Sequence, residues 1–538
     1  MRYIEGAIRE QSMLFPESLE DYVSEDNPVR YINAFVDSLN LSQFGFTHSQ
    51  TAKTGRKPYN PADLLKLYLH GYLNRTRSSR RLEKSTYSNV EVIWLMRKLH
   101  PDHKTIADFR RLNQTALKKV CREFTLLCKS MGLFGCELVF IDGSKFSADN
   151  HNSRCYTQKK LQKLLKNINE QIEKYFETLE QQDQSEQHVS MPTSKELGYK
   201  ISQLEQKRAE LEQLQQQLET SEEPQISLTD PDSRLMKNKN GYDMSYNVQI
   251  AVDDKHKLIA DFEATNDSND LNQLSNMALK AKETLGANQL KVGADTGYDN
   301  DHEIVKCEKE NISCYIPSKQ NSQNAKKGLY TNDDFSYDAE NNCYICPANQ
   351  KLTYRFQAYK SGRQVKIYEG ITCKSCSERQ KCTTAKRGGR RIYRWVHEEI
   401  IEQHRQRVKD NPEIIARRKA VVEHPFGTIK HWMEHRYFLT RGLKSVNAEM
   451  SLSVLTYNMK RVLNIMTVKE LIGILRMKAQ FYSILECKPL KLNMKSLFFP
   501  SPGNNESIIF DKYYQNLKFN LFSFSKFSFP LTKLAFCH

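Results

Sequence analysis

Two aspartates are placed where they could hold a divalent metal ion. The run ELVFIDG predicts a buried strand over residues 137–141 that ends at Asp142, and LKVGAD predicts another strand that ends at Asp295. If the two strands are neighbours in one sheet, the carboxylates converge, and hard carboxylate oxygens suit Mg²⁺ or Mn²⁺. The alternative for each residue is a solvated surface acid or a helix cap.

A third acid, Glu423, stands in RRKAVVEHPFGTIKHW, where a continuous helix would place Lys430 on the same face two turns later. An acid and a base would then face one substrate. Pro425 cannot donate a backbone hydrogen bond, so we expect the helix to kink or to begin near it. Three acids together favour a catalytic site more strongly than any one of them does.

Cysteines form a second candidate site. The chain has 13 cysteines, and five of them lie within 40 residues: Cys343, Cys346, Cys373, Cys376 and Cys382. In a chain that is not exported, such clustering favours a metal over disulfides. Two C-x₂-C pairs can supply four thiolates to a closed, structural zinc site, with Cys382 able to replace Cys376, and the strand-like KLTYRF and VKIYEG suit a zinc ribbon. The alternative is a set of reduced thiols without a metal.

Positive charge is concentrated in two blocks. The chain carries 80 Lys and Arg against 64 Asp and Glu, a net charge of +16; residues 51–130 hold 18 basic and 6 acidic side chains, and residues 381–445 hold 16 and 7. Two separate basic regions suit a long polyanion such as DNA, although basic side chains also solvate helix faces. The candidate phosphate contacts are Arg56, Lys57, Arg75, Arg77, Arg80, Arg81, Arg417, Arg418 and Lys419.

No window approaches the roughly 20 apolar residues of a membrane span, and the N-terminus lacks the apolar segment of a signal peptide. We therefore expect a cytoplasmic protein without a membrane partner. At 538 residues the chain is long enough for about three domains.

The apolar pattern changes character along the chain. Helical spacing marks residues 60–131 and 397–465, and SYNVQIAVD and HKLIADFEA read as strands. Strands followed by a helix and another strand predict a mixed α/β sheet. Residues 157–223 show a coiled-coil repeat in two arms around Pro192, which predicts an antiparallel hairpin, with an intermolecular coiled coil as the alternative.

Several motifs together resemble the insertion-sequence transposases of the DDE type, in the eleven-eighty-two family: VFIDGSKFSADN, YNVQIAVD, GADTGYDN, VVEHPFGTIKHWM and FLTRGLKSVNAEMSLSVLTYNMKRVLNI. The resemblance extends to about residue 467. It implies a ribonuclease-H-like α/β core, with Asp142, Asp295 and Glu423 as the three motif acids. It also implies Mg²⁺-dependent cutting and joining of DNA at the terminal inverted repeats, in bacterial cytoplasm at the nucleoid, by a homodimer or larger oligomer.

The sequence departs from the related pattern of Tyr, Arg, Glu and Lys at set spacing. Ala416 stands at the Tyr position and Lys419 at the Arg position, and the neighbouring Arg418 is able to substitute. Two other functions stay open: an inactive, decayed copy or repressor that only binds DNA, and a nuclease that cuts without joining.

The expected domains follow from these patterns. They are an all-α N-terminal DNA-binding domain (1–135), the catalytic domain in two stretches (136–156 and 224–320) completed by a helical part (397–467), a coiled-coil insert (157–223), a zinc-ribbon insert (335–390) and a tail without a recognisable site (468–538).

Overall fold

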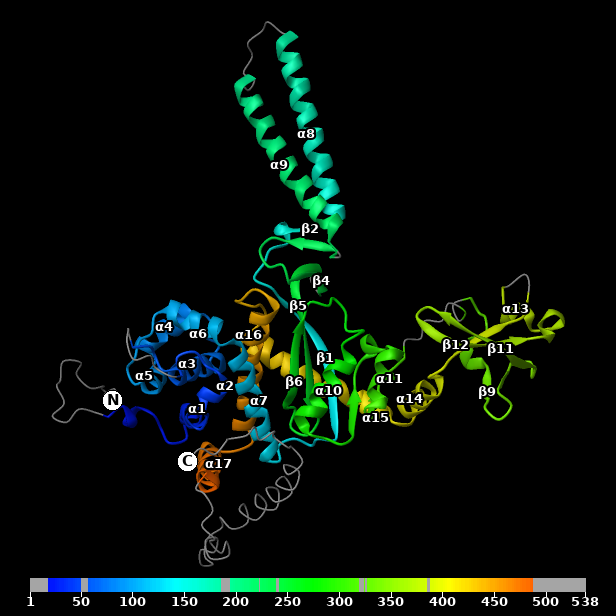
Figure 1. The fold of residues 1–538 in the computed structure, drawn as a ribbon. Helices are drawn as coiled ribbons and strands as arrows, with labels where there is room; N and C mark the ends of the chain where they lie inside the picture. The colour runs from blue at the N-terminus through cyan, green and yellow to red at the C-terminus, as the bar shows by residue number, and fades with distance from the viewer. Residues whose placement is uncertain are drawn as a thin grey trace, which may run out of the picture.

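A computed structural model describes residues 18–49, 57–184, 194–221, 223–238, 241–318, 324, 327–384 and 388–486. A central sheet lies between helices, with a helical N-terminal part on one side, a second, smaller sheet on the other and a long helix hairpin above (Figure 1). The predicted mixed α/β class is confirmed.

The N-terminal part is made of short helices. They are α1 (Pro28–Asp37), α2 (Leu41–Phe44), α3 (Pro61–Leu73), α4 (Ser79–Ser88), α5 (Val90–Leu95), α6 (His103–Leu112) and α7 (Gln114–Ser130), after a 3₁₀ turn at Leu19–Tyr22. Helix α3 begins where the sequence predicts, because Pro61 suits a first turn and the Asn60 side chain accepts from the Ala62 backbone N–H at 2.9 Å. It is buried on nearly all sides and forms the centre of this part.

The central sheet positions the candidate acids. Its strands are β1 (Leu138–Ser147), β4 (Arg234–Asn238), β5 (Gly241–Asp253), β6 (Ile259–Thr265), β7 (Leu290–Gly293) and β8 (Ile312–Tyr315). Their order is β4-β5-β1-β7-β8, and β6 also pairs with β5. Strands β5 and β6 run antiparallel to their neighbours, whereas β1, β7 and β8 are mutually parallel.

Helices flank this sheet. They are α10 (Leu274–Leu285), α11 (Asp301–Lys309), α14 (Glu398–Asp410), α15 (Pro412–Gly427), a π-helical turn (Thr428–Trp432) and α16 (Leu443–Leu463). Two asparagines of α16 act as a substitute strand along β6, where Asn447 bonds both backbone groups of Ala264 and Asn458 bonds both of Ile259, each bond at 2.9 Å. An otherwise open sheet edge is thereby paired.

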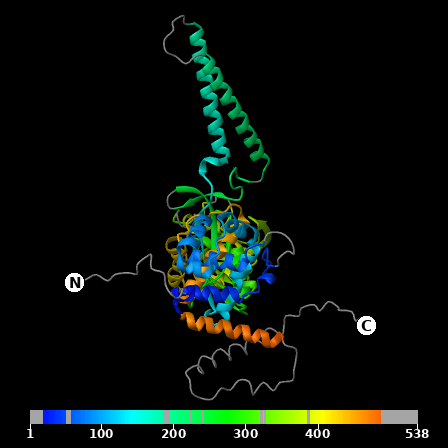
Figure 2. The ribbon, with the colours of Figure 1, turned by 90° about the vertical axis from the view of Figure 1, so that its left-hand side faces the viewer.

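A helix hairpin projects from the sheet (Figures 1 and 2). Strands β2 (Cys155–Thr157) and β3 (Gln225–Ser227) pair at its base, and α8 (Gln158–Gln184) and α9 (Ser194–Thr220) form its arms. The arms pack through an apolar seam made by Leu161, Ile168, Ile172, Leu211 and Leu218. Pro192, at the expected bend, lies outside the described residues.

The smaller sheet contains the cysteine-rich region. Its strands are β9 (Ser336–Asp338), β10 (Cys343–Ile345), β11 (Lys351–Lys360), β12 (Arg363–Gly370) and β13 (Arg391–Trp395), in the order β13-β12-β11-β10-β9, with the short helix α13 (Arg379–Cys382) beside them. All its pairings are antiparallel.

The chain continues beyond the motifs as α17 (Val468–Glu486), which packs against α1 and forms an ion pair from Lys478 to Glu123 of α7 at 2.9 Å. The beginning of the expected tail is therefore helical, and residues 487–538 lie outside the described part. None of the described helices combines the length and apolar character needed to cross a membrane.

Candidate active site

Asp142 lies within a strand rather than at its end. The sequence predicts that the strand stops at Asp142, but β1 continues to Ser147 because β5 pairs with it residue by residue as far as Ser245. Gly143 does not end the strand. It makes room instead, since a Cβ atom there would lie 2.5 Å from Asp270 Oδ1 and 2.4 Å from Gln249 Nε2.

Asp142 and Asp295 are neighbours across two parallel strands. The register pairs Phe140 of β1 with Gly293 of β7, and each acid follows two residues later. Asp295 begins a 3₁₀ turn by accepting from the Gly297 N–H at 2.8 Å. Burial raises the pKa of Asp142 to about 6, and the negative charge of Asp295 adds to this rise while Arg418 opposes it.

Asp270 is a further acid at this site, and the sequence reasoning missed it. It lies in the loop between β6 and α10, and its Oδ1 accepts from Asn247 Nδ2 at 2.8 Å and from Gln249 Nε2 at 2.6 Å, both on β5. Its charge also contributes to the raised pKa of Asp142. The run NDSNDLNQ offers only the signal of a turn or helix cap, so nothing in it indicates a carboxylate aimed at the sheet.

Tyr298 is linked through Gln249 to the acidic cluster, which consists of Asp142, Asp270 and Asp295. Its buried hydroxyl donates to Gln249 Oε1, while the amide nitrogen of the same glutamine donates to Asp270. Burial, followed by the charges of Asp270, Asp142 and Asp295, raises the pKa of Tyr298. The hydroxyl therefore stays protonated and fixes the glutamine, which in turn fixes Asp270.

Helix α15 covers β1 and contributes Arg418, whose Nη1 lies 3.7 Å from Asp142 Oδ1. Glu423 of the same helix is exposed and pairs with Lys419 at 3.8 Å. Among the described residues, no hydrogen bond or ion pair links Glu423 to another residue of the acidic cluster. Arg417 pairs with Asp254 at 2.6 Å.

Lys430 reaches β1 from the π-helical turn. Helix α15 passes through Pro425 without ending there, and the π-helical turn follows directly. Lys430 Nζ donates to Ser144 Oγ and to the Lys145 carbonyl, both at 2.6 Å, and lies 4.3 Å from the centre of the Phe146 ring. Lys430 thus stands beside the residue that lies two positions after Asp142.

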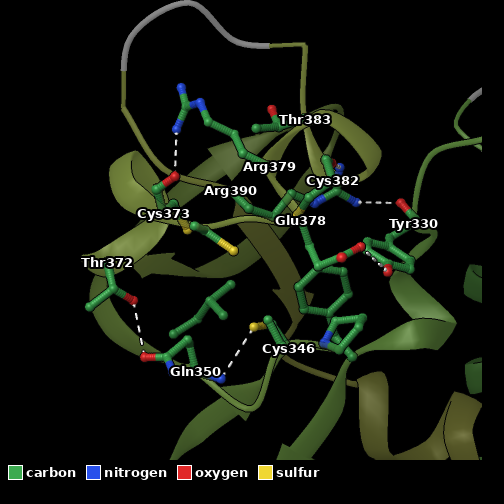
Figure 3. Close-up of a pocket in the computed structure, with 15 residues that line it drawn as sticks. Tyr330, Cys346, Gln350, Thr372, Cys373, Glu378, Arg379, Cys382, Thr383 and Arg390 are labelled. Atoms are coloured by element: carbon green, nitrogen blue, oxygen red, sulfur yellow. Dashed lines mark hydrogen bonds between the residues drawn. The ribbon is translucent and has the colours of Figure 1, made fainter.

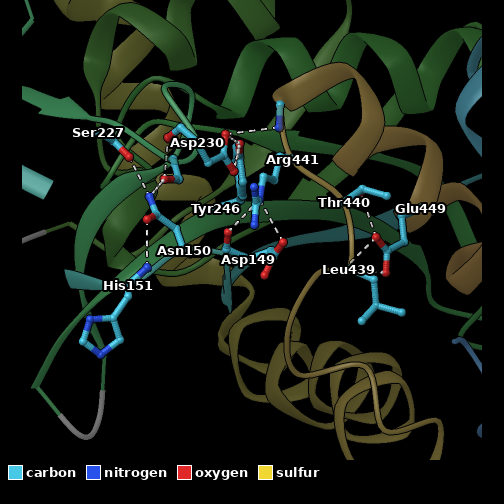
Figure 4. A network of polar contacts seen from close by, with 12 residues as sticks. Asp149, Asn150, His151, Ser227, Asp230, Tyr246, Leu439, Thr440, Arg441 and Glu449 are labelled. Atoms are coloured by element: carbon cyan, nitrogen blue, oxygen red, sulfur yellow. Dashed lines mark hydrogen bonds and ion pairs between the residues drawn. The ribbon is translucent and has the colours of Figure 1, made fainter. Parts of the chain in front are cut away.

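The segment after Lys430 is held by a network of polar contacts (Figure 4). Glu449 of α16 accepts from the Leu439 N–H at 3.0 Å and from the Thr440 hydroxyl at 2.8 Å. Arg441 pairs with Asp149, just beyond β1, at 2.8 Å. The loop between the π-helical turn and α16 is therefore fixed against β1.

Arg77 is buried in an ion pair, whereas the sequence suggests that it contacts phosphate. Its guanidinium donates to Glu449 Oε1 at 3.0 Å and to the carbonyls of Tyr437 and Glu434, and it is 6% exposed. Its charge is thus neutralised inside the protein. The remaining candidates described in the basic N-terminal region, Lys57, Arg75, Arg80 and Arg81, are exposed, and Arg56 lies outside the described residues.

Four of the five clustered cysteines line one pocket: Cys346, Cys373, Cys376 and Cys382 (Figure 3). The backbone N–H of Gln350 donates to Cys346 Sγ at 3.3 Å. A Cβ at Gly370 would lie 2.5 Å from Cys373 Sγ, so only glycine leaves room for this thiol. Cys343 is buried in β10 and does not line the pocket. The arrangement therefore differs from the expected site, in which Cys343 and Cys346 are ligands of the same metal ion.

Neither cluster is preformed around a metal ion. Over the described part of the chain, no group of three or more His, Cys, Asp or Glu side chains is arranged to hold one. The donor chemistry nevertheless fits in both places, since partly buried carboxylates gather at the central sheet and thiols gather at the smaller sheet.

Comparison with known families identifies two segments. Residues 17–112 match the family described as "Transposase domain (DUF772)", and residues 345–463 match the family described as "Transposase DDE domain". A search of curated proteins found no match. Among solved structures, the chain matches the cryo-EM structure of the piggyBac transposase synaptic complex with hairpin DNA, with 9% identity, a TM-score of 0.28 and coverage of 90% of this chain and 87% of that one.

Proposed function

From the two transposase domains that the chain carries, we propose that it binds the terminal inverted repeats of an insertion sequence and catalyses Mg²⁺-dependent DNA strand cleavage and strand transfer. The observation that carries this proposal is the parallel register of β1 and β7, which brings Asp142 beside Asp295. We further propose that the central sheet with its flanking helices is a ribonuclease-H-like catalytic core.

Asp142 and Asp295 would hold Mg²⁺, and Glu423 is proposed as the third acid. Burial raises the pKa of the partly buried Asp142, and the charge of Asp295 raises it further, so both carboxylates would gain from a shared cation. Bound there, the metal would stabilise the charge that develops on the attacking and leaving oxygens of a phosphodiester. Asp270, held by Asn247 and Gln249, would orient the acids around it.

The basic side chains would place the DNA. Lys430, held at Ser144 beside the acids, would contact the phosphate backbone near the scissile bond. Arg80 and Arg81 on α4, together with Lys57 and Arg75, would bind phosphates of the inverted repeat. Because one chain offers one acidic cluster, two element ends would require a dimer or a larger oligomer.

The decisive test is incubation of the full-length protein with Mg²⁺ and a mini-element DNA, with cleaved ends and joined products as readouts. Asp142→Ala, Asp295→Ala and Glu423→Ala should each abolish both products and leave DNA binding in place. Glu413→Ala, which removes an exposed acid from the same helix as Glu423, is the matched control and should stay active. Cleavage without joining would support a nuclease, and binding without cleavage an inactive copy.

We also propose a structural zinc site at Cys346, Cys373, Cys376 and Cys382. The shared pocket, the N–H bond to Cys346 Sγ and the space left by Gly370 support it. Purified without chelator, the protein should contain about one zinc per chain. Cys346→Ser should lose that zinc, whereas Cys343→Ser should keep it; equal loss in both variants would contradict this choice of ligands.

A further inference from the structure

The smaller sheet carries an unusual number of exposed aromatic rings. Phe356 on β11 is 49% exposed and Tyr393 on β13 is 36% exposed. Such rings are normally buried in the protein interior. A group of rings exposed to solvent therefore indicates a surface that binds an apolar, planar ligand. The sheet lies at one end of the molecule and is connected through α14 to α15 (Figure 1).

The same region is the most basic part of the chain. Residues 351–396 contain 13 Lys and Arg and only 2 Asp and Glu, a net charge of +11 in 46 residues. For comparison, residues 51–130 carry a net charge of +12 over 80 residues. This net positive charge favours a polyanion as the partner of this region.

Strand alternation places rings and charges on one open face. Phe356 and Lys360 point the same way from β11, and the pairing of Phe356 with Ile367 and of Ile367 with Tyr393 carries this face across to β13. Lys360 Nζ lies 3.5 Å from the centre of the Tyr393 ring, which shows that the two share that face. Arg391, two residues before Tyr393, is half-exposed and forms an ion pair with Glu369 of β12 at 3.2 Å.

The opposite face is covered at its centre. Tyr368, Ile392 and Leu352 pack there with Phe335 and Tyr344 in the small core of the sheet. The face of Phe356 and Tyr393 is covered only in part, since Val365, Ile367 and Trp395 on it are buried while Phe356, Lys360 and Tyr393 are exposed.

The sheet is fixed to the catalytic part of the molecule. Arg363 of β12 pairs with Asp301 of α11 at 2.6 Å, and the guanidinium of Arg394 on β13 donates to Glu402 Oε2 of α14 at 2.8 Å. The open face consequently keeps a set orientation relative to the central sheet.

We propose that the open face of β11–β13 binds single-stranded DNA, with bases stacked on Phe356 and Tyr393 and phosphates held by Lys360. Aromatic rings stack on bases only when those bases are unpaired, and stacking combined with a basic groove is how single strands are bound without sequence preference. The inference rests on the proposed transposase function for the source of that strand, which would be the DNA end opened by cleavage.

The test measures binding of a fluorescein-labelled 12-nucleotide oligo-dT, and of a duplex of the same length, to the full-length zinc-loaded chain without Mg²⁺. The double variant Phe356→Ala/Tyr393→Ala should raise the Kd for oligo-dT at least about ten-fold, since each stacked base contributes substantially. Lys360→Ala should also lower the salt dependence by about one phosphate contact. Duplex binding should change by less than about two-fold.

Tyr359→Ala is the matched control, because Tyr359 is 78% exposed on the same strand but points to the opposite face. It should leave the Kd for oligo-dT unchanged, and all variants should keep their zinc and circular dichroism spectrum. An equal loss in Tyr359→Ala, tighter binding of duplex than of oligo-dT, or an unaffected double variant would each overturn the proposal. Since no cleavage is measured, these outcomes are independent of whether the protein transposes DNA.

Discussion

Replacing Arg77 by methionine should destabilise the protein rather than act on DNA directly. The guanidinium lies 3.0 Å from Glu449 Oε1, and the two side chains are 6% and 0% exposed. Methionine fills similar space but leaves the carboxylate without its hydrogen-bonded cation. Breaking a buried pair from one side costs about 3–5 kcal/mol, because an uncompensated charge stays buried.

Thermal melting followed by circular dichroism measures this effect. For a cooperative unit of about 150–250 residues, each kcal/mol shifts the melting temperature by about 2–4 °C, so Arg77→Met should melt at least about 6 °C below the wild type. Glu449→Gln, which keeps acceptors for Leu439 and Thr440 but removes the charge, provides the second corner of a double-mutant cycle. The double variant should lose less stability than the sum of the single ones.

Two results would refute this reasoning. One is an Arg77→Met protein that melts within about 1 °C of the wild type, which would mean that the pair contributes little. The other is strict additivity in the cycle, which would show that Arg77 and Glu449 do not stabilise each other. If Arg77→Met lost DNA binding while its melting temperature stayed unchanged, Arg77 would be a DNA contact after all.

Asp270→Asn should raise the Mg²⁺ concentration for half-maximal cleavage by about 10–100-fold, since a supporting charge is lost; an unchanged Mg²⁺ titration would contradict its role. Arg80→Ala/Arg81→Ala should flatten the salt dependence of inverted-repeat binding by about two contacts without lowering the melting temperature, and an unchanged slope would remove α4 from the DNA interface. Burial lowers the pKa of His404 to about 4 from 6.5, so unfolding takes up a proton as pH falls from about 6.5 to about 4, and roughly 1.4 kcal/mol of stability per pH unit is lost across that window. His404→Gln should show a flatter pH dependence of melting there, and an equally steep loss would contradict this assignment.

The adjacency of Asp142 and Asp295 could be predicted because each acid follows an apolar run, and acids that follow neighbouring parallel strands meet. The extent of β1 could not be predicted. Gly143 reads as a strand end, yet it is required inside the strand to admit the side chains of Asp270 and Gln249. Whether a glycine ends a strand or makes room within it depends on the side chains that approach it. Those of Gln249 and Asp270 lie more than 100 residues away in the sequence.

The sequence patterns miss Asp270 and place Arg77 among the phosphate contacts for the same physical reason. A polar residue in a turn or in a basic run is usually solvated, and sequence patterns assign it so. Both residues instead meet buried partners from distant segments, Gln249 for Asp270 and Glu449 for Arg77. Cys343 shows the converse, since a C-x₂-C spacing suggested a ligand but strand pairing in β10 buries this thiol away from the pocket.

The buried Arg77–Glu449 pair has a consequence for how DNA would be handled. Arg77 lies two residues before α4, which carries Arg80 and Arg81. Its guanidinium also donates to the carbonyls of Glu434 and Tyr437 in the segment that follows Lys430. Because the Arg77 side chain is buried among these partners, α4 cannot move relative to that segment without exposing a charge. A DNA end bound by α4 would therefore reach Lys430 and the acids at a fixed distance along the DNA. Cleavage at a defined position requires such a fixed distance.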